Sequence, residues 1–171
     1  AEVRDALTPA LRAAGAAVLI VTHDAEDALA MADHLVLLDQ GEVLQAGTPE
    51  ACYLRPISLA AARMLGPVEA LPARVDGDAV ATPLGRFVKP EGEATGWQLL
   101  VRPGDVRLAD QGVAATVVAR RFAGNVTDVT VVMIGPDGEH RLTVSHAGPV
   151  PAIGQPAFLA LAPDRAVVVP A

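Results

Sequence analysis

An apolar run that ends in a polar triplet constrains the fold of this chain more than any other stretch. Residues 17–21 are apolar and rich in β-branched side chains, and Thr22, His23 and Asp24 follow directly. A short run of this kind is typical of a buried parallel strand, and residues 25–33 continue with the spacing of an amphipathic helix. Because ligands of open α/β sheets bind at the carboxyl ends of the strands, the pattern predicts that His23 lies at such a binding edge.

The residues before this run predict a helix. Apolar side chains recur with helical spacing over residues 3–14, and Gly15 follows in the position of a C-terminal cap. Helix, loop and strand make half of a βαβ unit. A strand buried on both faces needs partner strands and covering helices, and this sequence does not obviously contain them. We therefore expect the chain, which also lacks an initiator Met, to be a fragment of a longer protein.

Capping and turn residues predict the elements that follow. Asp24 is expected to cap the helix after the strand. The sequence then predicts, in order, a strand over 35–38, a hairpin turn at 39–41, a strand over 42–45, a helix from Thr48 to Pro56, and a helix over 59–65 capped by Ser58. Gly66 and Pro67 close this α/β portion, so the first domain is expected to span residues 1–66.

The composition changes after Pro67 to short apolar strands separated by Gly, Pro and Asp turns, which predicts a small all-β domain over residues 67–171. The clearest turns are at 124–125 and 135–138. In the strand expected over 126–134, Val129, Val131 and Met133 share one face. A closed or nearly closed barrel would remove the edges that such strands expose. The expected strands are 73–75, 79–81, 98–102, 113–122, 126–134, 140–145, 157–161 and 166–169.

Charge and composition exclude several classes of protein. The net charge is −7, and the 13 Lys and Arg residues are dispersed, whereas a nucleic-acid surface needs a basic stripe. Every apolar run is far shorter than the roughly 20 residues of a membrane-spanning helix, and the N-terminus lacks a signal-peptide pattern. The single cysteine, Cys52, cannot form an internal disulfide, so we expect a reducing, cytoplasmic compartment.

The order of motifs in the N-terminal part resembles that of the ATPase subunits of ATP-binding cassette (ABC) transporters. The strand ending in Thr22-His23-Asp24 resembles the family's last core strand and switch histidine. The resemblance continues through Asp39-Gln40-Gly41-Glu42, Gly47-Thr48-Pro49-Glu50 and Tyr53-Leu54-Arg55-Pro56. It implies that the first domain is the end of a RecA-like α/β ATPase core.

The resemblance implies a catalytic and ATP-binding role for one residue, His23. In the full-length parent, with ATP and Mg²⁺ bound, His23 would hydrogen-bond the γ-phosphate and help to position the attacking water. The sequence contains no phosphate loop, no Leu-Ser-Gly-Gly-Gln-type signature and no apolar strand ending in Asp-Glu. The fragment is therefore expected to start just after the parent's catalytic carboxylate, to bind no cofactor tightly and to be inactive alone. Ala25 stands where the family often has Gln, so no role passes to it.

The second half resembles the regulatory barrel, of oligonucleotide-binding (OB) type, that follows the ATPase core in solute importers. The motifs that carry this resemblance are Arg102-Pro103-Gly104-Asp105-Val106-Arg107 and Phe122-Ala123-Gly124. Val68-Glu69-Ala70-Leu71 departs from the family, which usually has Asn here. The resemblance implies a homodimer whose barrels contact each other, membrane permease partners that hold the protein on the inner face of the cell membrane, and in some relatives a small regulatory ligand at the barrel. Thr82-Pro83-Leu84-Gly85 most resembles ferric-iron importers, with polyamine and sugar importers close behind.

Other candidate sites are less favoured by their sequence context. His34, His140 and His146 could join His23 in a metal site, but they lack ligand spacing, so no metal site is predicted. Ser58 and Ser145 lack the Gly-x-Ser-x-Gly context of a hydrolase. Gly104 and Gly124 are interpreted as turn residues. The competing hypothesis for function is a non-enzymatic module in which a barrel pair captures a small anion or regulates a partner.

Overall fold

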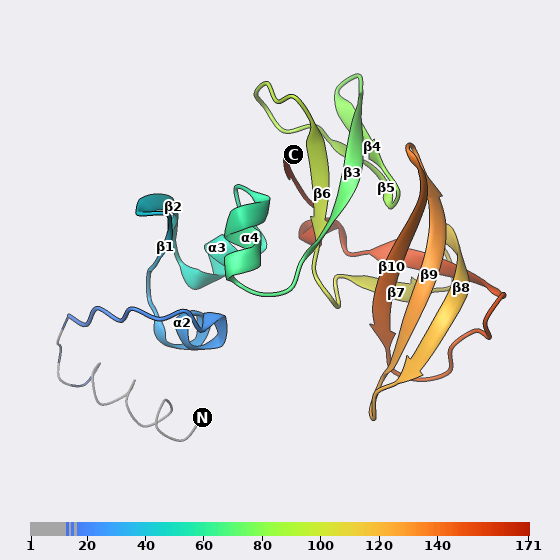
Figure 1. Ribbon diagram of the computed structural model, residues 1–171, viewed down its shortest axis with the longest axis horizontal. Helices are drawn as coiled ribbons and strands as arrows, with labels where there is room; N and C mark the ends of the chain where they lie inside the picture. The colour runs from blue at the N-terminus through green and yellow to red at the C-terminus, as the bar shows by residue number, and fades with distance from the viewer. Residues whose placement is uncertain (1–12, 14, 16) are drawn as a thin grey trace. The chain divides into compact units, whose positions relative to one another are not determined.

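The computed structural model describes residues 13, 15 and 17–171 of the chain (Figure 1). The chain divides into two compact units, residues 1–66 and 67–171. The helix predicted over residues 3–14 lies outside the described residues, Ala13 excepted.

Over residues 17–66, the first unit has three short helices and one hairpin. The elements are α2 (Ala25–Met31), β1 (Leu35–Asp39), β2 (Glu42–Gly47), α3 (Pro49–Leu54) and α4 (Leu59–Met64). The predicted hairpin is confirmed, because β1 and β2 pair antiparallel. The predicted caps are confirmed as well: the hydroxyls of Thr48 and Ser58 accept the N–H groups of Ala51 and Ala61, each at 3.2 Å. The elements enclose a small core of Leu35, Leu37, Cys52, Ala61 and Leu65.

The strand predicted over residues 17–21, ending at Thr22-His23-Asp24, is not formed in this chain. These residues have no strand assignment, and the side chains of Leu19 and Val21 are 91% and 90% exposed. The physical reason is that a strand needs backbone partners, and among the described residues none pairs with this segment. The prediction of a buried strand was therefore wrong for this chain. The segment is nevertheless apolar, as its exposed side chains show.

The second unit consists of two five-stranded sheets that curl around one core, as the green and orange strands of Figure 1 show. Its expected all-β, barrel-like architecture is confirmed. One sheet has the order β12-β6-β3-β4-β5 and the other β10-β9-β8-β11-β7, with antiparallel pairing between all neighbours. The strands are β3 (Glu69–Asp76), β4 (Ala79–Thr82), β5 (Gly85–Val88), β6 (Trp97–Val101), β7 (Val106–Ala109), β8 (Val113–Phe122), β9 (Thr127–Gly135), β10 (Gly138–His146), β11 (Pro156–Leu161) and β12 (Val167–Pro170), with a short 3-10 turn at Pro163–Arg165.

The barrel has an open seam. The edge strands β10 and β7 of the same sheet lie against each other without strand pairing. The chain therefore forms two curled sheets rather than one fully closed barrel. An edge strand carries backbone N–H and C=O groups that are paired on one side only.

Alternation along β9 decides which of its faces enters the core. Val129, Val131 and Met133 are almost completely buried, as predicted, and they pack with residues of both sheets. The outer face carries Asp128 and Thr130, which are half-buried. A bulge in β8 between Val117 and Ala119 shifts the register of its pairing with β9, and β8 beyond it is exposed.

We expect Gly112→Ala to destabilise the second unit strongly. Gly112 has a φ of +141°, and a Cβ atom there would lie 2.1 Å from the carbonyl oxygen of Leu159. Backbone strain alone costs about 1–3 kcal/mol, and the collision with β11 adds to it. Urea unfolding followed by the fluorescence of Trp97, the one Trp in the sequence and buried in β6, measures the loss.

Gly154→Ala is the matched control, because its φ is +85° and nothing lies within 4 Å of the added Cβ atom. Its loss should reflect strain alone and be smaller by about 2 kcal/mol. Equal losses in the two variants would contradict the close approach of Gly112 to β11.

Candidate functional site

His23 occupies an exposed bend that leads into α2. Two hydrogen bonds shape the backbone around it. The Thr22 hydroxyl accepts the N–H of Asp24 at 3.0 Å, and the Asp24 carboxylate accepts the N–H groups of Glu26 at 2.8 Å and of Asp27 at 3.2 Å. Asp24 is thus the N-cap of α2, as predicted. The arrangement leaves the imidazole of His23 exposed just before the first turn of a helix.

The other histidines lie on different elements from His23. His34 lies directly before β1, whereas His140 and His146 are both half-buried in β10. In the part of the chain that the structure describes, no three His, Cys, Asp or Glu side chains are grouped as metal ligands.

The Arg102–Asp105 motif forms the tight turn between β6 and β7. The N–H of Asp105 donates to the Arg102 carbonyl at 3.0 Å, and the Asp105 carboxylate accepts the N–H of Arg102 at 2.9 Å. Gly104 has a φ of +92°, which the third position of a type II turn requires, so its interpretation as a turn residue is confirmed. The turn is therefore held by two reciprocal hydrogen bonds.

Arg102 ties this turn to the beginning of the second unit. Its side chain is buried, with the residue 8% exposed, and its guanidinium donates to the Pro67 carbonyl at 3.2 Å. A buried charge needs such a partner, because desolvation without one is costly. The guanidinium thus hydrogen-bonds a backbone carbonyl, and the side chain is buried in the barrel.

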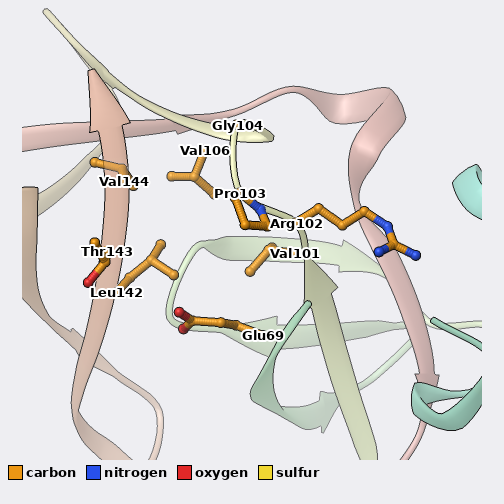
Figure 2. A pocket seen from close by; sticks show the side chains of 9 residues that line it. All are labelled: Glu69, Val101, Arg102, Pro103, Gly104, Val106, Leu142, Thr143 and Val144. Carbon is orange, nitrogen blue, oxygen red and sulfur yellow. The ribbon is translucent and has the colours of Figure 1, made fainter. Parts of the chain in front are cut away.

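A small pocket lies at the seam beside this turn (Figure 2). Glu69 at the start of β3 directs its carboxylate into the pocket, whereas the Arg102 guanidinium points away from it. Partial desolvation of the carboxylate raises the pKa of Glu69 above its ordinary value, although the residue as a whole is exposed. The cavity has a volume of about 20 Å³, which is room for about one water molecule. Its lining residues are Glu69, Val101, Arg102, Pro103, Gly104, Val106, Leu142, Thr143 and Val144.

Sequence reasoning did not identify Glu69 as a site residue. The stretch Val68-Glu69-Ala70-Leu71 stood out only as a departure from the family pattern. The sequence offered one signal for Glu69 as a site residue, namely a carboxylate within an apolar stretch at the start of a strand. The fold was needed to show that this carboxylate faces the edge of β10.

A second polar cluster covers the outer face of β8, β9 and β10. Ser145 donates to the Asp128 carboxylate at 2.6 Å, and Arg121 lies 2.5 Å from the other oxygen of the same carboxylate. The hydrogen bond from Ser145 is the main cause that lowers the pKa of Asp128, and Arg121 adds to it. Thr130 and Thr143 pair through their hydroxyls at 3.0 Å. These contacts join three neighbouring strands across one face of the sheet.

None of the helices within the described ranges is long and apolar enough to span a membrane.

The second unit matches a known domain family. Residues 99–169 match the model of the TOBE domain. The second unit is therefore a TOBE-type β-barrel. This class rests on the family match together with the curled antiparallel sheets and the Arg102–Asp105 turn.

Curated relatives extend the match into the first unit. The chain is 42% identical over 136 residues to "Fe(3+) ions import ATP-binding protein FbpC" of Streptomyces avermitilis, which covers 78% of this chain and 39% of the relative. It is 38% identical over 135 residues to "Spermidine/putrescine import ATP-binding protein PotA" of Marinobacter nauticus, covering 70% and 36%. It is 37% identical over 118 residues to "Sulfate/thiosulfate import ATP-binding protein CysA" of Brucella melitensis, covering 64% and 32%. The chain thus belongs to the family of ATP-binding subunits of ABC importers, and the matches span less than half the length of these relatives.

We expect Glu69→Gln to change the pH dependence of stability in one direction. Because the folded-state pKa of Glu69 is raised, its contribution to stability is fully present below its unfolded pKa and is lost as the pH rises through the folded pKa. Gln does not titrate. The variant should therefore gain stability relative to the wild type as the pH rises from about 4 to about 7.

Urea midpoints of both proteins, measured at both pH values by Trp97 fluorescence, test this. Taking the difference between variant and wild type cancels the titration of other groups. A difference that stays constant with pH would contradict the burial of the Glu69 carboxylate.

Proposed function

We propose that this chain is the C-terminal part of the ATP-hydrolysing subunit of an ABC importer, in which ATP binding and hydrolysis drive solute uptake through a membrane permease. The observation that carries the proposal is the match to importer ATP-binding subunits over 78% of the chain. Because the 136 aligned residues outnumber residues 67–171, the match reaches from the barrel into the first unit. Residues 1–66 then form the end of the nucleotide-binding domain, and residues 67–171 form the regulatory barrel.

His23 is proposed to hydrogen-bond the γ-phosphate of ATP in the parent protein. Its exposed position before the N-terminus of α2, on a backbone fixed by Thr22 and Asp24, supports this. An imidazole so held can donate to a phosphate oxygen and orient a water molecule. ATP supplies the transferable phosphoryl group. The described residues group no carboxylates as Mg²⁺ ligands, so the magnesium is proposed to depend on other parts of the parent.

The segment over residues 17–22 is proposed to become a buried parallel strand in the parent. Four consecutive large apolar side chains, Val18 to Val21, are exposed here. Stable proteins rarely leave such a group of apolar side chains in contact with water. Pairing with neighbouring strands would cover them and hold His23 at the carboxyl end of a sheet. This would complete the RecA-like α/β core.

The proposed partners follow from the same assignment. Two copies of the subunit would form a homodimer, and permease subunits would hold it on the cytoplasmic face of the cell membrane. Ferric iron is the solute that we propose to test first. The relatives from Streptomyces avermitilis and Streptomyces coelicolor, which are 42% and 41% identical, are both named as Fe(3+) importers.

A ligand-binding role for the barrel is the competing hypothesis, and the pocket beside Glu69 does not support it, because it has room for about one water molecule. A small anion is disfavoured there for a second reason. The charge directed into it is the Glu69 carboxylate, while the Arg102 guanidinium is turned toward Pro67. Repulsion from the carboxylate would oppose an anion there.

We expect His23→Ala in the full-length parent to reduce ATP hydrolysis roughly a hundredfold, the usual effect of removing a group that stabilises transition-state charge. Binding of a fluorescent ATP analogue should remain nearly unchanged, because other elements hold the phosphates. His34→Ala, at an exposed site before β1, is the matched control and should hydrolyse ATP normally. Equal hydrolysis by His23→Ala and the wild type would exclude the proposed role.

We also expect the chain to dimerise weakly through the second unit. This unit exposes large apolar side chains, including Phe122 and Ile134, that a second barrel could cover. Sedimentation equilibrium over a range of concentrations measures the association. A strictly monomeric profile at the highest concentration would contradict the expectation that the barrels of two chains contact each other in a dimer.

A further inference from the structure

We draw no further inference here: the strongest candidate, the exposed apolar surface patch with Ile134 of β9 and Phe158 of β11 on the outer face of one barrel sheet, belongs to the barrel contact already proposed, and nothing in the structure shows what else covers it.

Discussion

The need of every strand for a hydrogen-bonded neighbour governs the structure of this chain. An unpaired backbone group is costly when it is buried, so an apolar segment becomes a strand only where partners are available. Residues 67–171 contain those partners, and two five-stranded sheets form around one core. Residues 17–22 have none among the described residues and stay exposed. The same requirement for paired strands thus explains why the barrel forms and why the segment before His23 does not form a strand.

The barrel satisfies this rule imperfectly at one seam, where the edge strands β10 and β7 lie against each other without pairing. The Arg102–Asp105 turn holds the end of β6 to the start of β7 and ties both to Pro67. This arrangement removes the guanidinium from the pocket and leaves Glu69 without a counter-charge.

Local signals in the sequence predicted much of the fold. Asp24, Thr48 and Ser58 cap helices, and the alternation in β9 buries one face, because these effects depend on a few neighbouring residues. β8 was predicted with its observed bounds, whereas β5 and β7 were missed. Both are four-residue strands, too short for a clear periodicity. The state of residues 17–22 and the direction of Glu69 depend on distant partners, which no local pattern contains.

The central claim is that His23 belongs to the switch segment of an importer ATPase. Determining the coding sequence upstream of Ala1 tests it most directly, because ATP hydrolysis needs elements that this sequence does not contain. The account predicts an in-frame phosphate loop, a signature motif and an apolar strand ending in Asp-Glu shortly before Ala1. An initiator codon at Ala1, with none of these motifs in frame, would contradict the ATPase role and leave the barrel as a binding module.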